Sequence, residues 1–311
     1  MTRAAALPRT VTVRAPAKVN LELTVGPQRS DGFHDVSTVF MAVGLHDEVT
    51  VRPSDRWEVT VSGPYAALVP ADASNLAVRA AESLGRSAGV SEPVAVHIHK
   101  EIPVAGGMAG GSADAAATLL ACDHLWGLGL PRDDLLGIAA TVGSDVPFVL
   151  TGGIAVGSGR GEQLAPVLAR GRYQWVFAVS DGGLSAPEVY AECDRLRGDQ
   201  PVPAPEPSTA MMTALRSGDV EALGAALSND LAAAAISLRP DLQDVLSAGL
   251  EFGAVGGVVS GSGPTVAFLT DSPEAALDLC VSLSASGVAS EVKRAKGPVH
   301  GAQIVTGPTH H

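Results

Sequence analysis

The chain has 311 residues, of which 46% are hydrophobic and 17% are charged, a composition typical of a globular protein with about two domains. Its formal net charge of −12 argues against nucleic acid or an anionic membrane as a partner, because both bind basic surfaces. Residues 1–9 lack the apolar run of a secretory signal, and no segment is long and apolar enough to span a bilayer. We therefore expect a cytoplasmic protein, in which the dispersed Cys122, Cys193 and Cys280 are small core residues of a reducing compartment.

The first predicted element is a strand over residues 11–25 that Pro16 interrupts. Apolar and polar residues alternate on both sides of the break, which is the period of a half-buried strand. Lys18 and Asn20 are polar residues at this break. A lone lysine in a strand is more often a solvated charge than part of a site, so the pattern alone favours the solvated interpretation of Lys18.

Five further elements follow before the most glycine-rich part of the chain. We expect strand, turn and strand over 36–51, a strand over 57–61, a helix over 75–84 and a strand over 94–98. Asp47 lies at the expected turn, and Ser74 is a plausible cap of the helix. His97 and His99 share one face of the last strand, but no third ligand with metal-binding spacing lies nearby, so a solvated face is favoured.

A glycine-rich loop over residues 103–114 leads into an alanine-rich helix over 112–126. Glycines allow backbone N–H groups to approach a ligand, and a helix N-terminus attracts anions, so this loop can hold a phosphate. The alternative is a flexible turn before a core helix. Gly106 and Gly111 have the spacing of a Walker loop, but Ser112 stands where that motif needs lysine, and the dinucleotide fingerprint also fails. If the loop holds a nucleotide, lysines from elsewhere must complete the site.

A helix over 131–140 precedes a turn that contains Asp145. This residue is either a helix cap or an acid presented at the end of an element. The following glycine-rich hairpin over 155–161 also lacks dinucleotide spacing. We expect the first domain to end near this hairpin, which divides the chain into residues 1–168 and residues 169–311.

The second half reads as an α+β sandwich with no internal repeat. The predicted elements are a buried strand over 175–179, helices over 210–215, 220–236 and 241–250, and strands on either side of a second glycine loop over 260–265, followed by a helix and a final strand.

Three segments, in this order and spacing, resemble the signature motifs of the GHMP kinases, the superfamily of galactokinase, homoserine kinase and mevalonate kinases. They are residues 16–21, 103–114 and 260–265. The segments 31–34, 143–147 and 159–162 resemble the branch that phosphorylates CDP-methylerythritol in the non-mevalonate isoprenoid pathway. The resemblance covers about residues 11–269. It implies an α+β fold of two domains, with an N-terminal, ATP-binding domain of the ribosomal-protein-S5-like type and a C-terminal, ferredoxin-like sandwich.

The activity implied by the resemblance is ATP- and Mg²⁺-dependent phosphorylation of the 4-hydroxyl in the erythritol part of CDP-methylerythritol, to give a 2-phosphate. Lys18 and Asp145 match the catalytic pair of the superfamily, which reverses the structural interpretation of both residues. A carboxylate can accept the proton of the attacking hydroxyl, and a nearby ammonium keeps that carboxylate ionised. The implied partners are therefore the small-molecule substrate and ATP.

The resemblance also implies binding residues. The phosphates of ATP are expected on the glycine loop, which consists of Pro103, Val104, Ala105, Gly106, Gly107, Met108, Ala109, Gly110, Gly111, Ser112 and Ala113. Lys100 and Asn75 match positions near the adenine, and Ser112 is a candidate ligand of Mg²⁺. The positions that match substrate-binding residues are Asn20, Phe33, His34 and Tyr190, where His34 hydrogen-bonds cytosine and the two aromatic rings stack on it.

Three residues depart from the pattern of the superfamily branch. Ala113 replaces a common serine, Ala186 stands where a threonine can occur, and Phe33 replaces a tyrosine. The last change loses a hydroxyl hydrogen bond worth about 1 kcal/mol. Two alternatives remain: another GHMP kinase of the homoserine or mevalonate type, and a non-catalytic metabolite sensor. A sensor has no need for the pair of Lys18 and Asp145.

Overall fold

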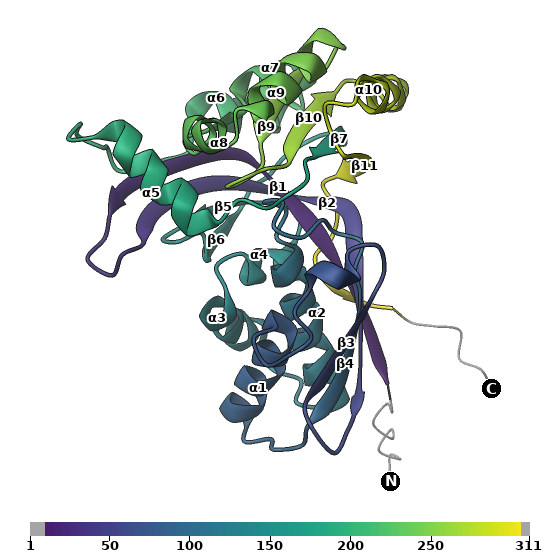
Figure 1. The fold of residues 1–311 in the computed structure, drawn as a ribbon. Coiled ribbons are helices and arrows are strands. Elements are labelled where there is room, and N and C mark those ends of the chain that lie inside the picture. The colour runs from purple at the N-terminus through teal and green to yellow at the C-terminus, as the bar shows by residue number, and fades with distance from the viewer. Residues whose placement is uncertain (1–9, 306–311) are drawn as a thin grey trace.

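A long hairpin connects the two halves of the fold (Figure 1). Its strands are β1 (Val11–Gln28) and β2 (His34–Pro53), which pair antiparallel over nearly their whole length. The computed structural model describes residues 10–305, so the expected lack of a signal in residues 1–9 falls outside it. Within the described residues, no helix combines the length and apolar character needed to cross a bilayer.

The first half is a sheet with helices packed on it, as Figure 1 shows. The strand order is β12-β1-β2-β4-β3, with β5 beside β2, β6 beside β5 and β8 beside β1. The other strands are β3 (Glu58–Ser62), β4 (Val94–His99), β5 (Ile154–Ser158), β6 (Gln163–Pro166), β8 (Ser228–Asn229) and β12 (Gln303–Ile304). The helical elements are η1 (Ala66–Leu68), α1 (Leu76–Ala88), α2 (Gly110–Leu125), α3 (Arg132–Val142) and α4 (Val146–Thr151).

The second half contains an antiparallel sheet with the order β11-β7-β10-β9 and a group of helices at the opposite end of the molecule from α1 (Figure 1). Its strands are β7 (Tyr173–Val179), β9 (Gly256–Val259), β10 (Val266–Thr270) and β11 (Glu291–Gly297). Its helices are α5 (Ala186–Arg197), α6 (Thr209–Ser217), α7 (Val220–Ala226), α8 (Ala232–Leu238), α9 (Asp241–Glu251) and α10 (Pro273–Ser286). The expected two-part α+β architecture is confirmed.

The hairpin contributes to the hydrophobic cores of both halves. Val13 and Val19 of β1 are buried in the first core, whereas Leu23 and Val25 near its other end pack in the second core with Val36 of β2. Successive side chains of a strand point to opposite faces, and residues 15–23 of β1 are buried on both faces. A strand this long can therefore contribute to two cores in sequence. The middle of the hairpin, between the cores, is therefore the place where both halves meet.

Several predicted elements differ in the structure. Strand β1 is continuous through Pro16, because a register shift there removes the need for a ladder donor. Strand β2 is continuous through Asp47, where a turn was expected, because the carboxylate finds buried partners. The predicted helix over 220–236 is interrupted by β8, which pairs with β1. Helices α4 and α5 were not predicted.

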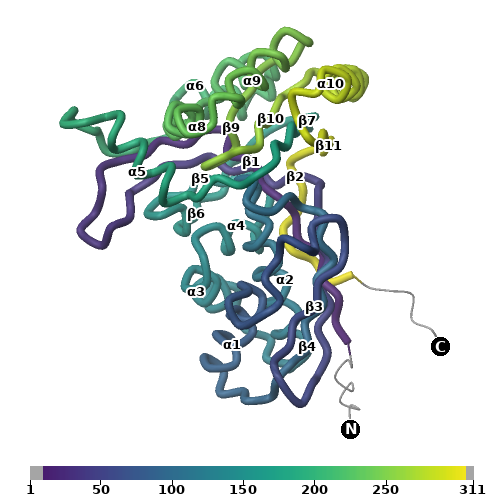
Figure 2. The backbone as a smooth tube through the Cα atoms, viewed as in Figure 1, coloured from purple at the N-terminus to yellow at the C-terminus, as the bar shows by residue number. Residues whose placement is uncertain are grey.

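The chain returns to the first half after the predicted domain boundary between residues 168 and 169. Figure 2 shows the C-terminal segment, in yellow, returning to the first sheet, where β12 pairs with β1. His300 also forms a bridge with Gly152 in the same region. The division into domains of residues 1–168 and 169–311 therefore remains a prediction. Two strands of the second range, β8 and β12, belong to the sheet of the first half.

Candidate active site

Lys18 and Asp145 lie side by side in the middle of the molecule. Lys18 is in the irregular part of β1, only 4% of its side chain is exposed, and its Nζ lies 3.9 Å from Oδ2 of Asp145. Burial lowers the pKa of Lys18, and the charge of Asp145 partly opposes this effect. Asp145 immediately precedes α4, but its side chain makes no capping hydrogen bond and is 30% exposed. The alternative that Asp145 serves as a cap is therefore not supported.

A chain of hydrogen bonds holds the Lys18 ammonium in position. Lys18 Nζ donates to Oδ1 of Asn20, and Nδ2 of Asn20 donates to Oγ1 of Thr38 at 2.7 Å. Thr38 in turn donates to the backbone carbonyl of Glu22 at 2.8 Å. Because both polar ends of its side chain have protein partners, Asn20 orients the lysine as well as lining the cavity described next.

The glycine loop opens onto a cavity of about 500 Å³ that also contains Lys18 and Asp145. The loop residues in its lining are Ala105, Gly106, Gly107, Ala109, Gly110, Gly111 and Ser112. Helix α2 begins at Gly110, two residues before the predicted start, and follows Ala109 in a left-handed conformation. Backbone N–H groups in the first turn of a helix lack intrahelical partners, and the helix dipole favours an anion there.

The other four residues of the loop lie outside the cavity lining. Pro103, Val104, Met108 and Ala113 do not belong to the lining of the cavity, and the side chains of Met108 and Ala113 are buried. The backbone N–H of Lys18 donates to the carbonyl of Met108 at 3.2 Å, which fixes the loop to β1.

The second glycine segment packs directly on the first. Ser260 Oγ donates to the carbonyl of Gly107 at 3.0 Å. A Cβ atom on Gly107 would lie 1.8 Å from the Ser260 carbonyl oxygen, and Gly107 has a φ of 71°, so only glycine fits. Gly261 and Ser262 complete the cavity lining, which explains why the two glycine-rich segments occur together in one chain.

Lys100 lies beneath the loop and outside both cavities of the site. Its buried Nζ donates hydrogen bonds to Oδ2 of Asp47 at 2.6 Å and to Oδ2 of Asp114 at 2.7 Å. Burial raises the pKa of Asp114 to about 7, an effect that the charge of Lys100 partly opposes. This buried triad joins β2, the end of β4 and α2. The structure therefore does not bring Lys100 to a position where its ammonium could contact a ligand.

Asn75 is likewise occupied by the protein. It caps α1, where Ser74 had been expected: its Oδ1 accepts from the Ala77 N–H at 2.9 Å, and its Nδ2 donates to the Pro70 carbonyl at 2.7 Å. Its neighbour Leu76 lines the first cavity, whereas Asn75 itself is buried and does not.

A second cavity, of about 610 Å³, adjoins the first and contains the predicted substrate-binding residues Phe33, His34 and Tyr190. Asp145 and Ser112 line both cavities. The rings of His34 and Tyr190 stack with centroids 5.1 Å apart, and burial raises the pKa of Tyr190 to about 12. Phe33 is 52% exposed. The predicted base-binding residues therefore lie together, and the predicted catalytic pair borders their cavity.

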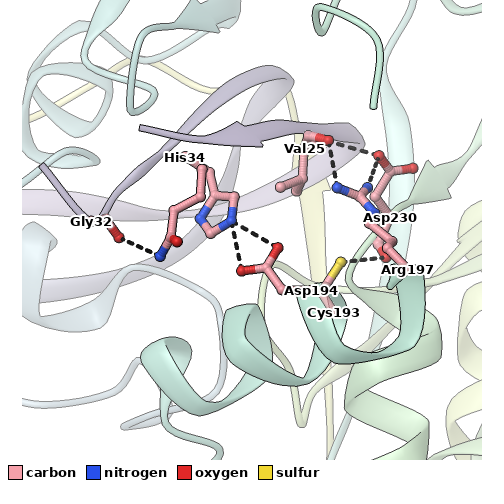
Figure 3. Close-up of polar contacts among 8 residues, drawn as sticks. Val25, Gly32, His34, Cys193, Asp194, Arg197 and Asp230 are labelled. Carbon is pink, nitrogen blue, oxygen red and sulfur yellow. Dashed lines mark hydrogen bonds and ion pairs between the residues drawn. The ribbon is translucent and has the colours of Figure 1, made fainter. Parts of the chain in front are cut away.

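Sequence reasoning missed two charged residues among those that line the second cavity. Asp194 of α5 accepts a hydrogen bond from His34 Nε2, with its two oxygens at 3.0 and 3.1 Å (Figure 3). Its signal was the spacing of four residues from Tyr190, which places both on one helix face. The other residue is Arg160, which lines both cavities and occurs in the segment 159–162 that carries part of the resemblance.

The site offers a metal ion fewer protein ligands than a dedicated metal centre does. Among residues 10–305, no group of three or more His, Cys, Asp or Glu side chains is arranged to hold a metal ion. His97 and His99 instead make hydrogen bonds with hydroxyls of the neighbouring strand β3. Ser112 and Asp145 present one hydroxyl and one carboxylate to both cavities, oxygen donors of the type that Mg²⁺ accepts together with phosphate and water.

Two family matches agree with this geometry. The chain matches GHMP kinases N terminal domain over residues 75–153 and GHMP kinases C terminal over residues 211–289. Together with the fold and the glycine-loop cavity, these matches define the class of the protein as a GHMP kinase. The homoserine kinase from Cytophaga hutchinsonii has the same fold, with a TM-score of 0.75 at 19% identity over 98% of this chain and 100% of that chain.

Closer relatives narrow the class. A 4-diphosphocytidyl-2-C-methyl-D-erythritol kinase from Streptomyces avermitilis is 54% identical over 295 residues, 95% of this chain and 99% of the relative. A crystal structure of 4-(cytidine 5'-diphospho)-2C-methyl-D-erythritol kinase aligns with a TM-score of 0.73 at 31% identity, over 95% of this chain and 100% of that chain. The chain belongs to the 4-diphosphocytidyl-2-C-methyl-D-erythritol kinase family.

Proposed function

We propose that this protein transfers the γ-phosphoryl group of ATP to 4-diphosphocytidyl-2-C-methyl-D-erythritol (CDP-methylerythritol), the substrate in the names of its relatives. The expected 4-hydroxyl cannot be the acceptor, because position 4 of that substrate already carries the diphosphocytidyl group. We take the acceptor to be the hydroxyl at C2 of the erythritol part. The observation that carries the proposal is the contact of Lys18 with Asp145 beside two adjoining cavities.

Asp145 is the proposed general base. Its carboxylate lines both cavities, so it can meet a hydroxyl in the second cavity that faces a phosphate in the first. The Lys18 ammonium, held by Asn20, attracts the negative charge that develops on the reacting oxygens. A general base contributes about 10²–10⁴-fold, so positioning and charge neutralisation must supply most of the rate.

The glycine loop is the proposed seat of the ATP phosphates. Its support is the cavity beneath the N-terminus of α2, where free backbone N–H groups converge. Mg²⁺, when bound with ATP, would neutralise phosphate charge, and Ser112 and Asp145 are the residues that would contribute oxygen ligands. Lys100 and Asn75, both engaged within the protein, would shape this cavity from behind.

The second cavity is the proposed cytidine site. His34 would hydrogen-bond the base, and Phe33 and Tyr190 would provide aromatic surfaces for it. Because Tyr190 stacks on His34 in this structure, its ring would have to adjust for the base to lie between two aromatic residues. Stacking contributes roughly 1–3 kcal/mol per base by analogy with single-strand binding proteins. A cytoplasmic location, with all three cysteines free, remains a prediction.

A coupled assay of ADP release tests this function. Purified protein with ATP and Mg²⁺ should release ADP with CDP-methylerythritol and show only background rates with homoserine or mevalonate. Turnover of homoserine or mevalonate alone would identify a different GHMP kinase. Tight binding of CDP-methylerythritol and ATP without any ADP release would instead identify a sensor, and either result would contradict the proposal.

A further inference from the structure

Arg160 lies in the turn between β5 and β6 and lines both cavities. The first cavity has a second cation, Lys18, and the backbone N–H groups of the glycine loop. In the second cavity, Arg160 is the only lysine or arginine among the described residues, and it shares that lining with the carboxyl groups of Asp145 and Asp194. Arg160 is therefore the residue that can offset the negative charge of these two carboxyl groups in the second cavity.

The guanidinium of Arg160 is available to a ligand. It lies over the ring of Phe33, with its Cζ 5.1 Å from the ring centroid. Its nearest acidic partner is Glu162, at 4.0 Å from Nε, and this carboxylate is already engaged by the backbone N–H of Arg160 at 2.7 Å. The Arg160 side chain is 33% exposed and makes no side-chain hydrogen bond within residues 10–305. Its fork of N–H donors thus has unused capacity.

The proposed substrate requires such a group. Its diphosphate carries two negative charges and joins the cytidine to the erythritol, so it must lie between the base-binding residues and Asp145. Placing these charges in a cavity with two carboxyl groups is unfavourable unless a cation offsets them. Arg160 contacts Phe33 at the base end and shares the cavity lining with Asp145 at the reacting end. A planar guanidinium can bind phosphate oxygens in pairs.

Resting on the proposed function, we propose that Arg160 binds the diphosphate of the cytidine-linked substrate and makes the second cavity selective for a nucleoside diphosphate ester over uncharged cytidine derivatives. The phosphates of ATP do not need this residue, since Lys18 and the glycine loop already serve the first cavity. In the protein without substrate, the guanidinium of Arg160 stacks on the ring of Phe33. One residue can therefore connect recognition of the base with recognition of the phosphates.

Binding of CDP and of cytidine, measured by calorimetry with saturating ADP and Mg²⁺ in the first cavity, tests this assignment. Wild-type protein should bind CDP more tightly than cytidine, and this preference should weaken as salt is added. In Arg160→Gln the preference should fall by about 10- to 100-fold through loss of CDP affinity, with cytidine affinity nearly unchanged. Arg160→Lys should retain part of the preference, since a lysine keeps the charge without the fork.

The matched control is Arg172→Gln, which removes the same charge from an exposed residue that lines neither cavity. Its preference for CDP should equal that of the wild type. An undiminished preference in Arg160→Gln would overturn the assignment, as would equal losses for CDP and cytidine, which would place the role of Arg160 at the base. Wild-type protein that binds neither probe would instead refute the proposed function and, with it, the role of Arg160.

Discussion

At the scale of single residues, the site depends on two charged groups that the chain separates widely and the fold brings to 3.9 Å. The burial of Lys18 is costly, because desolvation disfavours its charged form, yet the side chain remains in the interior with Asn20 and Asp145 as its polar partners. Such an arrangement favours a functional role over a structural one, since an apolar residue would fill the same space at lower cost.

Replacement of Asp145 by asparagine should separate binding from chemistry. The amide keeps the size of the side chain but cannot accept the hydroxyl proton, so Asp145→Asn should lower kcat by about 10²–10⁴-fold. The affinity for ADP, measured by calorimetry, should change by less than a factor of about ten, since the glycine loop is intact. Asp133→Asn, an exposed acid in the first turn of α3, is the control and should keep full activity. Near-normal turnover of Asp145→Asn would refute the assigned role.

Asp194 should determine which base the second cavity prefers. A carboxylate only accepts hydrogen bonds, so its contact with Nε2 of His34 places the proton there and leaves Nδ1 of a neutral ring as an acceptor. An acceptor suits the exocyclic amine of cytosine and opposes the carbonyl of uracil. Asp194→Ala should therefore reduce the preference for CDP over UDP by about tenfold in calorimetric titrations.

The control for Asp194→Ala is Asp199→Ala, which removes an exposed charge just after the same helix and lines neither cavity. It should keep the full preference for CDP. If Asp194→Ala discriminates between the two nucleotides as well as the wild type does, the tautomer of His34 is set by another group and the prediction is wrong.

At the scale of elements, the buried triad of Asp47, Lys100 and Asp114 holds the base of the glycine loop. Asp47 accepts from Lys100 and also from the backbone N–H groups of Glu101 and Ile102, at 2.7 and 2.9 Å. Lys100 also contacts Asp114 in the second turn of α2. The triad thereby fixes β2 to the end of β4 and to α2, beside the residues that face the first cavity.

The raised pKa of Asp114 gives the triad a pH dependence. With a folded pKa of about 7 and an ordinary value of 3.8, the native protein keeps a proton that the unfolded chain has already released between these pH values. Stability should therefore fall as pH rises from about 4 to about 7. Asp114→Asn removes this titrating group, so its free energy of unfolding should change less with pH. Relative to wild type, the free energy of unfolding of the variant should rise by on the order of 2–4 kcal/mol between about pH 4 and about pH 7.

Urea unfolding at a series of pH values measures this difference. Asp134→Asn, an exposed acid of α3, is the control, and its profile should run parallel to that of the wild type. Parallel profiles for Asp114→Asn and wild type would show that the folded protein does not hold the extra proton.

Prediction of these elements from sequence succeeded where the local periodicity of apolar residues determines the secondary structure. It failed where a partner distant in sequence determines it. The strand β7 and the helix α9 follow their apolar patterns closely. Asp47 has the residue type of a turn, but its partners are more than fifty residues away, so the sequence offers no local sign that β2 continues through it. The same reasoning applies to β8, whose two residues pair with β1 and interrupt an otherwise helical pattern.

At the scale of the whole molecule, the two halves expected from sequence share core side chains as well as the cavities of the site. Tyr173, Trp175 and Phe177 of β7 belong to the same core cluster as the strands and helices of the first half. Conversely, the far end of the β1–β2 hairpin packs in the second core. Composition shifts and glycine-rich turns can suggest where a domain ends, but they cannot reveal such exchange of side chains, which arises from pairing between distant segments.

The shared core predicts how the molecule unfolds. Because large buried side chains of β7 and the β1–β2 hairpin each belong to the core of the other half, neither half can lose its packing while the other keeps it. The full chain should therefore unfold in one calorimetric transition, with equal calorimetric and van't Hoff enthalpies. A fragment of residues 1–168 lacks Trp175 and Phe177, so it should bind a hydrophobic dye and show no sharp transition. Two separate transitions in the full chain, or cooperative unfolding of the fragment, would show that each half is stabilised by its own core.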